Sequence, residues 1–86
     1  MTIAYTRTAK KQLAKLDRPI QVQIKSYLDR LKMLDNPHMS GKALVGNYAG
    51  LWRYRVGDYR LICEIHDEKI LVTVLRIAHR KEVYRD

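Results

Sequence analysis

Apolar residues in the first third of the chain recur with the spacing of amphipathic helices. Residues 2–6 alternate like a short strand, and Thr6 or Thr8 can cap the helix that follows. That helix carries its apolar stripe at Ala9, Leu13 and Leu16. After a break at 17–19, with Pro19 suited to a first helical position, a second and longer helix is predicted from the apolar positions Ile20, Ile24, Tyr27, Leu28, Leu31 and Leu34.

The pattern changes to strand-like alternation in the second half. Residues 35–37 (Asp-Asn-Pro) stop the second helix, and residues 37–49 lack a clean period, which predicts an irregular connection. Strands are predicted over about 51–56, 59–66 and 69–78. Gly57-Asp58 suits a two-residue type II′ turn between the first two of these strands. Counting outward from that turn places Val56 opposite Tyr59 and Arg55 opposite Arg60.

Asp67-Glu68 is the candidate turn of a second hairpin. Pairing from it places Ile65 opposite Ile70, Cys63 opposite Val72 and Leu61 opposite Val74. Both hairpins then bury the same face, which also holds Trp52 and Tyr54. The sequence therefore predicts an α+β fold in a single domain, residues 1–86. In it, an N-terminal strand and a helical hairpin pack on one face of an antiparallel sheet of about four strands.

The chain is strongly basic, with a net charge of +8. Residues 1–49 hold nine Lys and Arg against three Asp and Glu, whereas residues 50–86 hold eight against six. A small domain with this excess usually binds nucleic acid, an acidic protein or an anionic membrane. Exposed helical lysines form a candidate RNA-binding footprint: Lys10, Lys11, Lys15 and Lys32, together with Lys25.

Arginines gather on the other face of the predicted sheet. Arg53, Arg55 and Arg60 share that face, and like charges placed opposite each other destabilise a sheet. Either acidic neighbours such as Asp58 and Glu64 neutralise them, or the face binds phosphate, for which arginine offers bidentate geometry and a permanent charge.

The segment after the last strand adds His79, Arg80 and Tyr84, which could return over the arginine face. His79 is either structural or an acid or base close to that face, and Tyr84 either anchors the tail or stacks on a base.

Other chemistry finds little support in the sequence. The histidines are scattered and lack cysteines at ligand spacing, so no metal site or other cofactor is expected. The single cysteine, Cys63, falls on the core face. The residues near the N-terminus have no apolar segment typical of a signal peptide, and no apolar run reaches the length of a membrane span, which predicts a soluble cytoplasmic protein.

Two segments carry a family resemblance. Residues 44–61 (LVGNYAGLWRYRVGDYRL) and 77–84 (IAHRKEVY), in this order after a strand and a helical hairpin, resemble the RelE/ParE superfamily of bacterial toxins from toxin–antitoxin pairs. The resemblance covers almost the whole chain. It implies the RelE-like microbial RNase fold, with an activity that is either ribosome-dependent mRNA cleavage or gyrase inhibition.

In RelE-like members the ribose 2′-hydroxyl attacks the adjacent phosphate of an A-site codon without a metal, leaving a 2′,3′-cyclic phosphate and a 5′-hydroxyl. By this resemblance Arg60 and Arg80 would stabilise the phosphate charge, and Tyr84 would stack on or orient a nucleotide. Arg53 and Arg55 stand where RelE has lysines. Because arginine cannot act as a base, His79 becomes the candidate base or acid.

The resemblance also implies a RelB-like antitoxin whose acidic segment wraps the toxin, and the ribosome and mRNA as further partners. Two alternatives stay open: a ParE-like inhibitor of DNA gyrase that breaks no bond, and a non-catalytic protein-binding or RNA-binding relic. The combination of Arg60, Arg80 and Tyr84 favours cleavage, since a pure binder does not need it.

Overall fold

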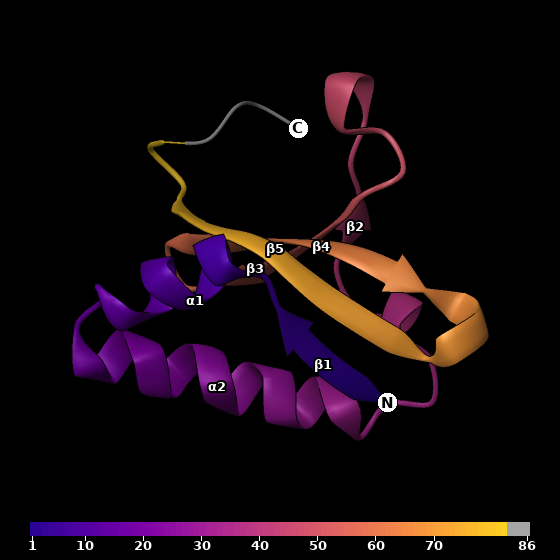
Figure 1. Ribbon diagram of the computed structural model, residues 1–86, viewed down its shortest axis with the longest axis horizontal. Coiled ribbons are helices and arrows are strands. Elements are labelled where there is room, and N and C mark those ends of the chain that lie inside the picture. Colours follow the sequence, from indigo (N-terminus) through magenta and orange to yellow (C-terminus); the bar gives the residue numbers. More distant parts are fainter. Residues whose placement is uncertain (83–86) are drawn as a thin grey trace.

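The computed structural model describes residues 1–82 and consists of two helices packed on a five-stranded sheet (Figure 1). The elements in chain order are β1 (Thr2–Tyr5), α1 (Arg7–Ala14), α2 (Arg18–Lys32), β2 (Lys42–Ala43), β3 (Trp52–Val56), β4 (Tyr59–His66) and β5 (Leu71–His79). Short 3₁₀ turns occupy Pro37–Met39, Gly46–Tyr48 and Asp67–Lys69. No helix within residues 1–82 combines the length and the apolar character needed to cross a bilayer.

Both helices begin where the sequence places them. The Thr6 hydroxyl accepts a hydrogen bond from the amide of Ala9 at 3.1 Å, which caps α1 and confirms one of the two predicted caps. Pro19 lies in the first turn of α2, where its missing N–H leaves no helical hydrogen bond unmade. Each helix buries one stripe against the sheet, with Ala9 and Leu13 from α1 and Ile24, Leu28 and Leu31 from α2.

The strand order is β1-β5-β4-β3-β2. The α+β class is confirmed, and the sheet of five strands differs from the predicted antiparallel sheet of about four in two particulars. β1 joins the sheet as a parallel neighbour of β5, from Thr2 opposite Leu71 to Tyr5 opposite Val74. A parallel pair needs a long connection, and almost the whole chain provides it here, so local pattern contained no signal for the pairing. The second difference is β2, which lies within the segment predicted to be irregular.

The first hairpin has the predicted register throughout. Val56 pairs with Tyr59, Arg55 with Arg60, and Trp52 with Cys63. Gly57 has a φ of +58°, whereas Asp58 is not among the described residues with positive φ, as a type II′ turn requires.

The second hairpin differs from the prediction. Its turn is the longer Asp67–Lys69 segment, closed by Ile70 in the left-handed region, so that Ile65 pairs with Val72 and Cys63 with Val74. A bulge then follows: Ile62 pairs with Arg76, which leaves Leu75 as an extra residue on β5. The bulge restores the burial of Ile77 opposite Leu61 and keeps Arg76 out of the core.

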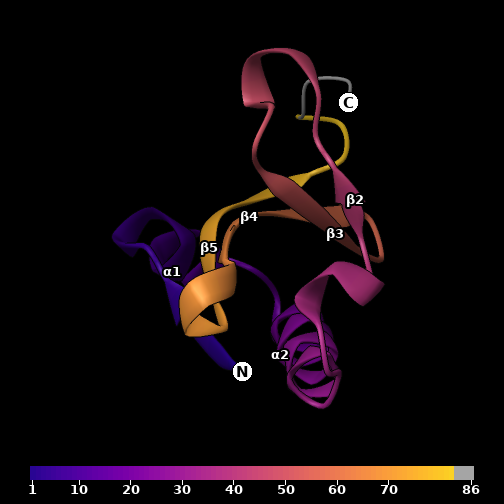
Figure 2. The same cartoon turned by 90° about the vertical axis from the view of Figure 1, so that its right-hand side faces the viewer.

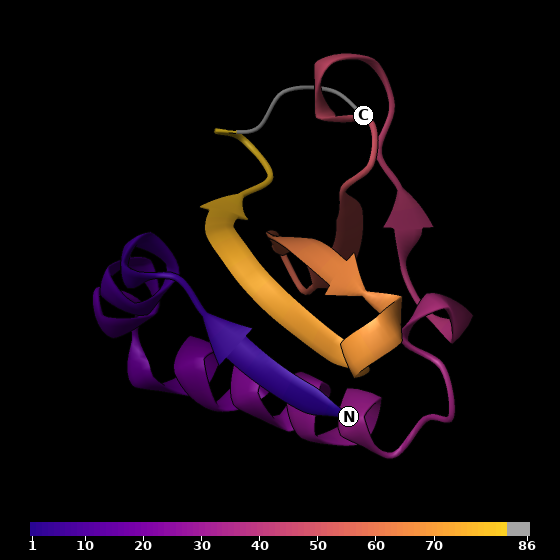
Figure 3. The same ribbon diagram turned by 45° about the vertical axis from the view of Figure 1, so that its right-hand side comes forward.

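The core lies between the helices and one face of the sheet, as predicted. Tyr54, Leu61, Cys63, Val72 and Val74 are fully buried there. Figures 2 and 3 show that α2 runs beneath the sheet, whereas the β2–β3 loop and the segment after β5 rise on the opposite side. These two segments therefore flank the outer face of the sheet and set where a ligand can approach it.

Candidate functional site

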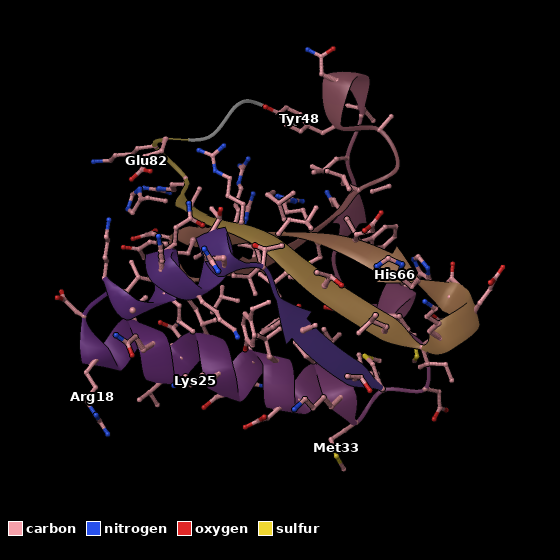
Figure 4. The ribbon with its side chains drawn as sticks, in the orientation of Figure 1. Arg18, Lys25, Met33, Tyr48, His66 and Glu82 are labelled. Atoms are coloured by element: carbon pink, nitrogen blue, oxygen red, sulfur yellow. The ribbon has the colours of Figure 1, made fainter. Side chains whose placement is uncertain are left out.

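Side chains of β3, β4 and β5 that point away from the helices form the outer face of the sheet. Side-chain alternation places Arg53, Arg55, Arg60 and Ala78 on this surface, which we call the arginine face. Figure 4 shows Tyr48 in the β2–β3 loop and Glu82 after β5 above the sheet, on its two sides. The arginine face is thus a floor between two raised segments.

Three arginines line one pocket of about 160 Å³ at the β3–β4 turn. Arg55, Arg60 and Arg80 form it together with the turn residues Gly57, Asp58 and Tyr59. Arg55 and Arg60 are cross-strand partners, so the ladder itself holds their side chains on the same face. Three permanently charged side chains therefore line a space large enough for a phosphate group, which we call the arginine pocket.

Arg80 reaches this pocket because two contacts tie it to the turn. Its amide donates to the carbonyl oxygen of Asp58 at 2.7 Å, and its Nε lies 3.6 Å from Asp58 Oδ1. The β5 bulge also contributes, since it sets Ala78 opposite Arg60 and continues the chain to Arg80 on the same face. The small side chain of Ala78 leaves room for the longer one of Arg60.

Arg53 occupies a different environment from Arg55. Only 8% of its surface is exposed, so it is not the solvated surface residue that one interpretation of the sequence would have. It lines a second pocket of about 320 Å³, which is formed by Tyr27, Ser40, Gly41, Lys42, Arg53 and Arg55. Arg55 thus lies between the two basic pockets.

His79 is not among the residues that line this pocket, although its neighbour Arg80 and its cross-strand partner Tyr59 both line it. It pairs with Tyr59 across the ladder, on the side of the sheet that also carries Leu61, and the two rings meet edge to face at 5.2 Å between centroids. Its Nδ1 accepts a hydrogen bond from the Lys81 amide at 3.1 Å. The bulge determines this face, because it changes the side-chain alternation along β5 before His79.

The remaining predicted residues are Tyr84 and the helical lysines. Tyr84 falls outside the described residues. The lysines predicted to bind RNA are exposed on or near the helices, and none lines the arginine pocket: Lys10, Lys11, Lys15, Lys25 and Lys32. Figure 4 shows Arg18 and Lys25 on the helices at the side away from the arginine face.

Two charged residues that line these pockets were not predicted to belong to the site. Lys42 lines the second pocket, but it falls in the connection for which no element was predicted. Asp58 was considered only as a possible ion-pair partner, although the turn that it helps to form faces the arginine pocket. The Gly57-Asp58 turn signal locates Asp58 beside Arg55 and Arg60, so the sequence did contain the information for the second residue.

The titratable groups of the core offer no reactive alternative. Burial raises the pKa of the Cys63 thiol from 9.0 to about 12, so the thiol stays neutral and is no nucleophile at physiological pH. Burial likewise raises the pKa of Tyr54, whose hydroxyl donates to the Pro37 carbonyl at 2.7 Å. The histidine–carboxylate pairs His38–Asp67 and His66–Glu64 include none of the residues that line the arginine pocket.

Comparison with known proteins agrees with this architecture. A family model described as the ParE toxin of the type II toxin–antitoxin system parDE matches residues 3–84. Toxin RelG of Mycobacterium tuberculosis is 34% identical over 84 residues, covering 98% of this chain and 95% of the relative, and Toxin RelE of the same organism is 35% identical over 83 residues, covering 96% and 84%. The toxin–antitoxin complex RelBE2 of M. tuberculosis contains a chain with 35% identity and a TM-score of 0.81, with 92% of this chain and 90% of that chain covered.

Proposed function

The chain belongs to the RelE/ParE superfamily of toxins from type II toxin–antitoxin systems, and on this premise we propose that it is a ribosome-dependent endoribonuclease that cuts mRNA in the ribosomal A site. The observation that carries the proposal is the convergence of Arg55, Arg60 and Arg80 on one pocket. Cleavage by 2′-hydroxyl attack passes through a phosphorane with additional negative charge, and guanidinium groups are suited to bind it.

The arginines have separable tasks in this reaction. Arg60 lies in the middle of the sheet, where its cross-strand neighbours restrict it, and it holds the phosphate undergoing attack. Arg80 approaches the same phosphate from the segment after β5 and stabilises the leaving oxygen. Arg55 and Arg53 extend the positive surface towards the neighbouring nucleotide. Tyr84 is proposed to stack on a base, as the family resemblance implies.

The partners follow from the same surface. The structure similar to this chain from M. tuberculosis is a complex of a toxin with its antitoxin. A RelB-like antitoxin with an acidic segment is therefore proposed to bind this chain and to cover the arginine face, which would block phosphate binding. The ribosome and its mRNA are the proposed targets, and the cytoplasm is the compartment that contains them.

A second candidate function is inhibition of DNA gyrase without bond cleavage. It is favoured by the family model, which is described for the ParE toxin. A gyrase inhibitor would bind protein through the arginine face and would not need to hold a phosphate. Supercoiling by purified gyrase in the presence of the toxin separates this function from the first.

The deciding experiment is 5′-end mapping of a defined mRNA incubated with the protein, with and without programmed ribosomes. We expect cuts within A-site codons only when ribosomes are present, and we expect Arg60→Ala to lower kcat by about 10²–10³-fold, the usual effect of removing one group that stabilises transition-state charge. Arg18→Ala, which removes an exposed arginine on α2, is the matched control and should cleave like the parent.

Circular dichroism of each variant establishes that it is folded. If the folded parent gives no cuts on programmed ribosomes and blocks gyrase instead, the nuclease proposal is wrong and the arginine face is a protein-binding surface.

A further inference from the structure

The arginine pocket contains one carboxylate among the described residues that line it, that of Asp58. We propose that Asp58 is the general base that removes the proton from the ribose 2′-hydroxyl. This role rests on the proposed nuclease function and supplies the group that the arginines cannot provide.

The surroundings of Asp58 place its carboxylate beside the phosphate position. Arginines line the pocket from three segments: Arg55 from β3, Arg60 from β4 and Arg80 after β5. Asp58 Oδ1 lies 3.6 Å from Arg80 Nε, and 62% of the Asp58 side chain is exposed, so the carboxylate is accessible to a substrate. From α2 the uncharged Gln23 lies next to the turn at Gly57.

The turn also holds Asp58 in place. Type II′ geometry at Gly57-Asp58 fixes the backbone, and the Asp58 carbonyl accepts the Arg80 amide at 2.7 Å. A base must lie within hydrogen-bond reach of the proton that it takes, and a rigid turn reduces the cost of keeping it there.

The other groups in or near the pocket are less suited to this task. Guanidinium groups are always protonated, and a phenol such as that of Tyr59 carries its own proton at neutral pH. His79 has a suitable ring, but it packs on Tyr59 at the opposite face and its Nδ1 already accepts the Lys81 amide. Asp58 therefore takes the role that the sequence had suggested for His79.

Atoms and protons balance in the proposed step. Asp58 takes the 2′-hydroxyl proton while the 2′-oxygen forms a bond to phosphorus. The bond between phosphorus and the 5′-oxygen breaks, and the leaving 5′-oxygen takes a proton from water. The products are a 2′,3′-cyclic phosphate and a 5′-hydroxyl, with no change of oxidation state, and Asp58 returns its proton to solvent.

The test compares Asp58→Asn with His79→Gln in A-site cleavage on programmed ribosomes. Loss of a general base lowers rates by about 10²–10⁴-fold, so we expect Asp58→Asn to reduce kcat within this range and leave KM nearly unchanged. His79→Gln should retain kcat within about threefold, because only a group positioned to transfer the proton contributes the effect of about 10²–10⁴-fold. Asp67→Asn removes a similarly exposed carboxylate from the other hairpin turn and is the matched control, with parental activity expected.

Two further readouts separate a base from a residue that only positions Arg80. Asp58→Glu keeps a carboxylate that can accept the proton and should recover part of the activity. In an Arg80→Ala background, Asp58→Asn should lower kcat further. If it has no effect there, Asp58 acts only through Arg80 and the inference is wrong.

Failure of this inference is distinguishable from failure of the proposed function. If the parent and Asp58→Asn cleave alike, the nuclease function stands and Asp58 is not its base. If the folded parent does not cleave, both are overturned.

Discussion

Replacement of Gly41 by any other residue would strain the structure for two reasons. It has a φ of +80°, and a Cβ placed there would meet the carbonyl oxygen of Arg53 and would lie 2.6 Å from Trp52 Nε1. Gly41 comes directly before β2, whose Lys42 pairs with Arg53 of β3, and it lines the same pocket as Arg53. Only glycine combines this φ with this approach.

Gly41→Ala should therefore destabilise the protein by about 2–5 kcal/mol, the sum of the cost of a left-handed non-glycine residue and the cost of local overpacking. Urea unfolding followed by circular dichroism measures this change. Gly46→Ala is the matched control: Gly46 has a φ of +65°, but a Cβ added there would meet nothing within 4 Å, so only the backbone cost of about 1–2 kcal/mol applies. Equal losses in the two variants would contradict the packing argument.

At the scale of elements, the two hairpins show what the sequence could predict. The Gly57-Asp58 turn determines the register of β3 and β4 locally, and all of its predicted pairs are present. The turn of the second hairpin is longer than Asp67-Glu68, and the bulge at Leu75 shifts the pairing again. A bulge depends on contacts with a neighbouring strand and with the core, which local turn signals do not contain.

The candidate site likewise combines positions that local turn signals predict with positions that they do not. The positions of Arg55 and Arg60 followed from the first hairpin, and the structure places both in one pocket. The faces taken by His79 and Arg80 depend on the bulge, so the sequence could not assign them in the same way. The sequence held one sign that strict alternation fails in β5. The apolar positions there are Val72, Val74 and Ile77, and Arg76 lies between the last two.

α1 covers the edge of β5 beyond the end of β1 and makes a specific bond to it. Gln12 Oε1 accepts the amide of Ile77 at 2.7 Å, shortly after the bulge. Gln12→Ala would leave this part-buried amide without its acceptor, and we expect a loss of about 1–3 kcal/mol in the free energy of unfolding. Gln12→Glu retains an oxygen acceptor and should be less destabilising. Hydrogen exchange at the Ile77 amide provides the local measurement, with faster exchange expected in Gln12→Ala only.

At the scale of the whole molecule, the positive charge has two parts. Arg55, Arg60 and Arg80 line the arginine pocket, whereas the helical lysines do not line it and are exposed. The lysines can therefore act on RNA through the long-range field, which accelerates association and is screened by salt.

Replacing Lys10, Lys11 and Lys15 by Gln should thus leave kcat at saturating ribosomes unchanged and lower kcat/KM at low salt. The difference between the variant and the parent should shrink as salt rises, because the field is screened over about 10 Å at 0.1 M. Cleavage assays over a salt series measure this. A fall in kcat itself would show that these lysines contact the reacting RNA.

The pairing of β1 with β5 has a consequence for folding during translation. β1 lies at the edge of the sheet beside β5, and the Thr6 hydroxyl donates to the carbonyl of Leu75 at 2.8 Å. Such distant contacts form late, because the chain between them must first be made and closed into a loop. During translation the nascent chain cannot complete its sheet until β5 has emerged, and Arg80 follows β5. The arginine pocket can therefore form only after β5 and Arg80 have been made, so a growing chain that has not yet reached Arg80 carries no finished site.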